Sequence, residues 1–114
     1  MVTPKQFKKL SPEQLEMFKT IQARYKKKRP VPSKVAILTE RFGPFTVCVL
    51  FVGKRVFTGA SKLNHKDLVE AVCSKRVLNQ KTGDQFALNN AFRNYLAVPA
   101  RNWRVPEKAI HWVS

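Results

Sequence analysis

The chain has 114 residues, of which 44% are hydrophobic and 11% aromatic, so it holds enough apolar side chains for one domain with a modest core. This composition argues against a disordered chain, which lacks the apolar surface needed to offset the entropy of ordering. The 22 lysines and arginines against 7 acids give a net charge of +15 at pH 7, which favours a polyanionic partner, most commonly nucleic acid.

The first predicted element is a helix with a well-marked start. Ser11 is a good N-cap, Pro12 suits the first helical position, and Gln14 completes the spacing of a capping box. We expect the last turn to carry the lysines of residues 26–28, and the prolines of residues 30–32 to end the helix. Residues at helical spacing form one apolar stripe: Leu15, Phe18, Ile21, Gln22 and Tyr25.

The next elements are predicted strands, and the run from Phe45 to Val52 is the most decisive. It consists of β-branched, aromatic and aliphatic side chains, and it is apolar on both faces at the strand period of two. We therefore expect a central strand that is covered on both sides. A preceding strand is predicted from Lys34 to Glu40, with residues 41–44 as the turn between them.

A hairpin should follow the central strand. Gly53-Lys54 fits a two-residue loop, because a type II′ turn needs glycine at its first central position. Residues 55–58 return as the partner strand until Gly59 interrupts it.

Helices are predicted in the C-terminal half. The first runs from Asn64 to about Leu78, and the next runs from a cap-like start at residues 82–85 to about Ala97. The tail after it is too apolar for a disordered end, and residues 109–113 are a candidate for an added edge strand. The last helix is expected to bury Leu88, Ala91, Phe92, Tyr95 and Leu96.

These elements predict an α+β fold in the order α-β-β-β-α-α-tail, with a three- or four-stranded antiparallel sheet packed with about three helices. Residues 1–114 are expected to form a single domain, with a short basic N-terminal tail, 1–9, and an ordered apolar C-terminal tail, 100–114. Cys48 and Cys73 are interpreted as buried small side chains rather than a disulfide. The N-terminus lacks the apolar core of a signal peptide, and no run is long enough to span a membrane. We therefore expect an intracellular protein, cytoplasmic or associated with nucleic acid, with no membrane partner.

The sequence offers little for catalysis, and we expect no enzyme activity, cofactor or metal. His65 and His111 lie far apart, and the cysteines and histidines lack the spacing of a zinc site. No phosphate-binding loop, nucleophile elbow or metalloprotease motif is present. The seven acids are scattered along the chain.

At the level of pattern, residues 11–78 resemble double-stranded RNA-binding domains, which have a helix, three antiparallel strands and a second helix. The likeness is carried by the strand of residues 45–49, the Gly53-Lys54 turn, and the Gly-Ala-Ser-Lys run that ends at Lys62. The resemblance implies that Lys62 and Lys66 meet phosphates. The family's double lysine is here Lys62-Leu63, and another small α+β fold is the alternative.

The predicted function is non-catalytic binding of RNA or DNA, mainly through sequence-independent phosphate contacts. The alternative is a small protein that docks on an acidic protein surface and regulates or inhibits a nucleic-acid-processing enzyme. The oligomeric state stays open, since an apolar sheet face would also suit a dimer. Trp103, between two arginines, is a candidate for stacking on a base. The predicted contact residues are Lys26, Lys27, Lys28, Arg29, Lys34, Lys54, Arg55, Lys62, Arg101, Trp103 and Arg104.

Overall fold

The computed structural model describes residues 6–62, 80–100 and 105–113. Over these residues the predicted α+β fold is confirmed, with a three-stranded antiparallel sheet and three helices. The helix predicted over residues 64–78, together with Cys73, lies outside the described residues. No helix in the described ranges is long and apolar enough to cross a membrane. The elements are α1 (Pro12–Arg24), β1 (Ala36–Phe42), β2 (Phe45–Val52), β3 (Arg55–Lys62), α3 (Gln80–Tyr95) and α4 (Glu107–Val113).

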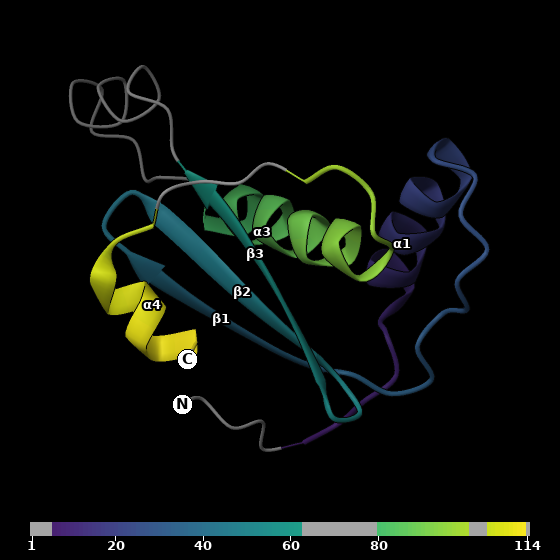
Figure 1. The fold of residues 1–114 in the computed structure, drawn as a ribbon, viewed down its shortest axis with the longest axis horizontal. Helices are drawn as coiled ribbons and strands as arrows, with labels where there is room; N and C mark the ends of the chain where they lie inside the picture. The colour runs from purple at the N-terminus through teal and green to yellow at the C-terminus, as the bar shows by residue number, and fades with distance from the viewer. Residues whose placement is uncertain (1–5, 63–79, 101–104, 114) are drawn as a thin grey trace.

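β2 is the central strand of the sheet, whose order is β1-β2-β3. Cys48 and Leu50 on one face belong to a buried cluster with residues of α1 and α3. Val49 and Phe51 on the other face belong to a second cluster, against which Trp112 of α4 packs. Figure 1 shows the result, with α1 and α3 on one side of the sheet and α4 on the other. The prediction of a central strand covered on both sides is confirmed.

Both hairpin loops are two residues long and both begin with glycine. Gly53 has φ +61°, as the predicted type II′ turn requires. Gly43 has φ +62°, and Pro44 fixes its own φ near −65°, so this loop also suits type II′ and not type I′. The turn predicted over residues 41–44 was therefore too long. Phe42 belongs to β1 because it pairs with Phe45 of β2. β1 starts at Ala36 rather than at the predicted Lys34.

The sequence predicted that the third strand stops at Gly59. In the structure it continues to Lys62. Glycine is a poor strand residue by local propensity, yet this one faces α3 at very close range. A Cβ atom built at Gly59 would lie 2.2 Å from the carbonyl oxygen of Ala87 and 2.2 Å from the backbone nitrogen of Ala91. The missing side chain is thus what allows α3 to lie against β3.

α1 starts as predicted but ends earlier. The Ser11 and Gln14 side chains form the reciprocal capping box, with Gln14 N–H donating to the Ser11 hydroxyl oxygen over 3.2 Å. The helix ends at Arg24, so Lys26, Lys27 and Lys28 follow the last turn instead of forming it. The end is a Schellman motif, in which Lys26 N–H donates to Ala23 C=O over 3.3 Å and Lys27 N–H donates to Gln22 C=O over 3.0 Å. Lys26 occupies the left-handed position of the motif, with φ +52°.

α3 ends in the same way. Ala97 has φ +56°, its N–H donates to Asn94 C=O over 3.2 Å, and Val98 N–H donates to Arg93 C=O over 3.0 Å. Val98 is buried, and Pro99 follows, as is common after such an end. The predicted inner face is confirmed, because all five expected side chains are buried: Leu88, Ala91, Phe92, Tyr95 and Leu96.

Replacing Ala97 by glycine is expected to stabilise the protein by about 0.5–1 kcal/mol. In the left-handed conformation the alanine Cβ atom is sterically strained, and glycine has no Cβ atom. The midpoint of urea unfolding, followed by circular dichroism, measures the change. Ala23→Gly, at an exposed helical position in the last turn of α1, is the matched control and should destabilise by up to about 1 kcal/mol. Two shifts of the same sign would contradict the assignment of the motif.

The prediction of an edge strand over residues 109–113 was wrong, because these residues belong to the helix α4. Pro106 C=O accepts a hydrogen bond from Ala109 N–H over 2.9 Å and so begins the first turn. Ala109 is fully buried, and Trp112 lies one helical turn further on the same side, where its ring centroid is 5.7 Å from that of Phe42. The three-residue spacing of Ala109 and Trp112 was the helical signal in the sequence.

Candidate nucleic-acid interface

One end of the sheet gathers cations from three separate segments. Ala36, the first residue of β1, pairs with Phe51, which lies two residues before Gly53. Lys34, two residues before Ala36, therefore lies at the same end of the sheet as Lys54 and Arg55 at the tip of the β2–β3 hairpin. All three side chains are exposed.

Lys8 arrives at the same end, although the sequence gave no reason to include it. Its backbone forms a two-way antiparallel bridge with Val35, with N···O distances of 2.7 Å in both directions. The Lys8 side chain is exposed. An isolated bridge of this kind has no periodic pattern, so only the fold shows it.

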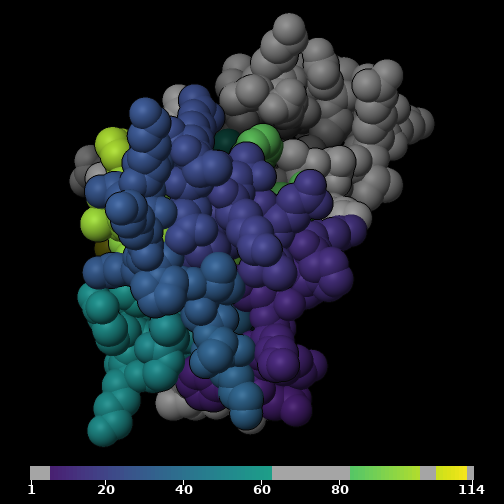
Figure 2. Space-filling model, turned by 90° about the vertical axis from the view of Figure 1, so that its right-hand side faces the viewer, coloured from purple at the N-terminus to yellow at the C-terminus, as the bar shows by residue number. Residues whose placement is uncertain are grey.

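A chain of cation–aromatic contacts links the hairpin to the loop after α1. The Arg55 guanidinium carbon lies 5.1 Å from the Phe57 ring centroid, and Phe57 meets Tyr95 edge to face at 5.2 Å. The same Tyr95 ring also contacts Arg29, whose guanidinium carbon lies 5.2 Å from the ring centroid. Figure 2, which faces this side, shows the blue loop after α1 above the teal hairpin.

The lysines of that loop complete the set. Lys26, Lys27 and Lys28 are exposed and lie just beyond α1. We name the following exposed cations the basic end: Lys8, Lys26, Lys27, Lys28, Lys34, Lys54 and Arg55. Within the described ranges, the ion pairs are Arg41 with Asp84 and Glu107 with His111, and neither involves the basic end. Its charges are therefore not neutralised by neighbouring carboxylates in the part of the chain that the structure describes.

Arg29 differs from its neighbours because it is half-buried and engaged inside the protein. Its guanidinium donates a hydrogen bond to the carbonyl oxygen of Tyr95 in the last turn of α3. Gln22 in turn donates to the carbonyl oxygen of Arg29 over 2.6 Å, and the Tyr95 hydroxyl donates to Pro30 C=O over 3.0 Å. Arg29 thus holds residues 26–29, which we name the basic loop, against the ends of α1 and α3. Its predicted contact with phosphate stays a prediction.

Other predicted contact residues are not brought to this end. Lys62 is exposed at the opposite end of β3, where its ammonium nitrogen lies 5.4 Å from the ring centroid of Phe45. Lys62 lies seven residues along β3 from Arg55, which corresponds to roughly 23 Å. Arg101, Trp103 and Arg104 lie outside the described residues, as does Lys66.

Two arginines that the sequence did not single out lie beside the basic loop. The guanidinium carbons of Arg24 and Arg93 lie 5.8 and 5.6 Å from the ring centroid of Tyr25. Arg93 also donates to Pro99 C=O over 3.4 Å. Arg93 belongs to α3, far away in sequence, so its place beside α1 depends on how the two helices pack.

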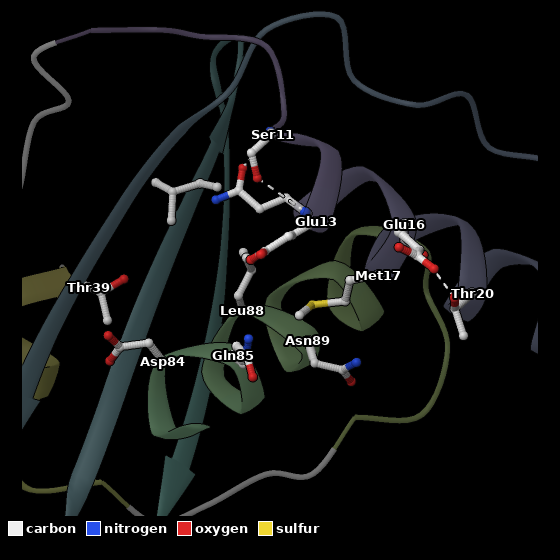
Figure 3. Close-up of a pocket in the computed structure, with 12 residues that line it drawn as sticks. Ser11, Glu13, Glu16, Met17, Thr20, Thr39, Asp84, Gln85, Leu88 and Asn89 are labelled. Carbon is white, nitrogen blue, oxygen red and sulfur yellow. Dashed lines mark hydrogen bonds between the residues drawn. The ribbon is translucent and has the colours of Figure 1, made fainter. Parts of the chain in front are cut away.

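The acids gather elsewhere. Glu13 and Glu16 of α1 and Asp84 of α3 line a groove of about 560 Å³ between α1, β1 and α3. Figure 3 shows this groove, with Met17 and Leu88 between the two helices. α1 begins at the groove and ends at the basic loop, a distance of roughly 20 Å for a 13-residue helix. The two acids of α1 thus lie in its first two turns and three exposed lysines follow its end, while Lys8 and Lys9 precede its start.

The described residues offer a buried thiol rather than an exposed nucleophile. Burial raises the pKa of the Cys48 thiol to about 12, against a smaller opposing effect of its hydrogen bond with Thr39, so the thiol stays protonated at neutral pH. No group of three or more histidine, cysteine or acidic side chains in the described ranges is placed to hold a metal ion. No protein-family model matches the chain, and no curated protein or solved structure matches it either.

Proposed function

We propose that the protein binds nucleic acid through its basic end, mainly by contacts with backbone phosphates. The supporting observation is that exposed cations of the N-terminal segment, the start of β1 and the β2–β3 hairpin meet at one end of the sheet. Ring contacts connect the hairpin to the loop that carries the lysines of residues 26–28, and no described carboxylate pairs with any of these cations. Each phosphate that these cations neutralise releases counterions, which supplies most of the free energy of such binding. The net charge of +15 adds long-range attraction.

Binding through this end is expected to depend little on base sequence. Tyr95 is only 7% exposed, and Phe57 is half-buried with the Arg55 guanidinium over its ring. These two rings are therefore largely covered and offer little open face on which a base stacks, whereas Phe7 beside Lys8 is 38% exposed. Lysines supply point charges for phosphates rather than a pattern of donors and acceptors for base edges.

The triple variant Lys26→Ala, Lys27→Ala, Lys28→Ala tests the interface. We expect it to weaken binding by about ten- to a hundredfold for every sequence alike, and to reduce the slope of log K against log salt by roughly 2–3. Fluorescence anisotropy with labelled 20-nucleotide single strands and duplexes, titrated at several salt concentrations, measures both quantities.

A matched control removes the same charge from other places. Lys19→Ala, Lys62→Ala, Lys108→Ala alters three exposed lysines outside the basic end. It should keep most of the affinity, because only the general attraction of the net charge falls. Equal losses in the two triple variants would contradict a localised interface.

The alternative function is docking on an acidic protein surface. Nuclease treatment of the cellular complexes distinguishes it from nucleic-acid binding. Under our proposal the wild-type protein binds nucleic acid at low salt, and its cellular complexes dissolve on nuclease treatment. Partners that survive nuclease, together with binding to bare nucleic acid only above tens of micromolar, would favour the acidic protein surface instead.

A further inference from the structure

The two edges of the sheet are treated differently. In the antiparallel register with β2, the backbone groups of Thr58 and Ala60 point outward from β3. Their carbonyl oxygens accept hydrogen bonds from the side-chain amides of Asn94 and Asn90 on α3, the latter over 2.7 Å. The side chains of α3 therefore satisfy part of the β3 edge, which protects it from pairing with another strand.

The β1 edge is only partly satisfied. The register with β2 points the backbone groups of Val35, Ile37 and Thr39 outward. Val35 pairs with Lys8, but within the described ranges no partner bonds the outward N–H and C=O groups of Ile37 and Thr39. Thr39 is exposed. An open antiparallel edge thus begins where the Lys8 bridge ends.

The acidic groove lies beside this open edge. Ile37 and Thr39 line it from β1, and Met17 and Leu88 give it an apolar part between the helices (Figure 3). Asp84 is paired with Arg41 at 3.1 Å, whereas Glu13 and Glu16 have no ion-pair partner among the described residues. In a protein of net charge +15, this groove is a local region that favours cations.

We propose that the β1 edge binds an extended basic peptide as an added antiparallel strand, with its lysine or arginine side chains in the acidic groove. The open edge supplies main-chain hydrogen bonds, and the groove selects the side chains. Residues of the peptide that pair with Ile37 and Thr39 also direct their side chains to the groove face, because directly opposite residues share a face. The peptide therefore carries cations at every second position. The Lys8 bridge at one end, and the Arg41 N–H that donates to the Glu40 carboxylate over 3.3 Å at the other, limit the main-chain hydrogen bonds of the added strand to Ile37 and Thr39.

The probe is the capped peptide Lys-Val-Lys-Val-Lys, added to isotope-labelled protein. We expect the amide signals of residues 37–41 to shift in NMR spectra and the amide exchange of Ile37 and Thr39 to slow by tenfold or more. N-methylation of the lysine amides should abolish both effects, whereas N-methylation of the valine amides, which point away from β1, should leave them. The double variant Glu13→Gln, Glu16→Gln should weaken peptide binding by about tenfold.

Other results would overturn the proposal. One is that the amide signals and amide exchange of Ile37 and Thr39 stay unchanged at millimolar Lys-Val-Lys-Val-Lys. Another is that Glu-Val-Glu-Val-Glu binds as tightly as the lysine peptide. Protection of Ile37 and Thr39 that grows with protein concentration, without peptide, would show that a second copy of the chain occupies the edge instead. These measurements use the protein and peptide without nucleic acid, so failure of this proposal is distinguishable from failure of nucleic-acid binding.

Discussion

Gly59→Ala is expected to destabilise the protein by about 3 kcal/mol or more, a large part of the stability of a small domain. The added Cβ atom would lie 2.2 Å from Ala87 O, 2.2 Å from Ala91 N and 2.8 Å from the carbonyl carbon of Asn90. All three are backbone atoms of α3, so no side-chain rotation relieves the clash. The helix itself has to move away from the sheet.

That movement would break other contacts at the same time. The Asn90 and Asn94 amides bond to the outward carbonyls of β3, and a displaced helix loses both hydrogen bonds. Phe92, on the same helix, is fully buried and packs edge to face on Phe18 of α1 at 5.4 Å. Lifting α3 therefore also opens the core cluster, which adds a cavity cost to the steric one.

Urea unfolding followed by circular dichroism measures the effect, and Gly53→Ala is the matched control. Gly53 has φ +61°, but nothing lies within 4 Å of its built Cβ atom, so we expect a loss of only about 1–2 kcal/mol from backbone strain. Ala87→Gly should not rescue Gly59→Ala, because the obstructing atom is a backbone oxygen. A Gly59→Ala protein as stable as wild type would show that α3 does not lie this close to β3.

The parts of the fold that local signals define were predictable from the sequence. The capping box of Ser11 and Gln14 needs only a three-residue spacing, and the Gly53-Lys54 turn needs only a glycine between two apolar runs. The doubly apolar run of β2 predicted burial on both faces. The lysines of residues 26–28 were found as a charge run, and they are indeed exposed.

The parts that depend on contacts between distant residues were not predictable. Glycine at position 59 normally interrupts a strand, and only the approach of Ala87 and Ala91 explains why this strand continues. Both Schellman motifs use a non-glycine residue, so the usual glycine signal was missing. The meeting of the hairpin with the basic loop depends on Phe57 packing on Tyr95, a contact between β3 and the end of α3.

Arg29→Ala is expected to cost about 2–3 kcal/mol of stability, more than the exposed lysines beside it. The change removes a charge-assisted hydrogen bond to Tyr95 C=O and the guanidinium over the Tyr95 ring. Arg29→Lys should recover little of this loss, because a lysine has no planar fork to bond the carbonyl and cover the ring together. Thermal and urea unfolding measure both variants.

Nucleic-acid affinity separates this positioning role from a phosphate contact. At a temperature where both variants are folded, we expect Arg29→Lys to bind within about threefold of wild type, because the charge is kept. Lys28→Ala should show the reverse pattern, with stability within about 0.5 kcal/mol of wild type and clearly weaker binding. Full stability of Arg29→Lys would mean that the contacts of the guanidinium with Tyr95 do not hold the loop. The loop lysines would then owe their position to the Schellman motif at Lys26 alone.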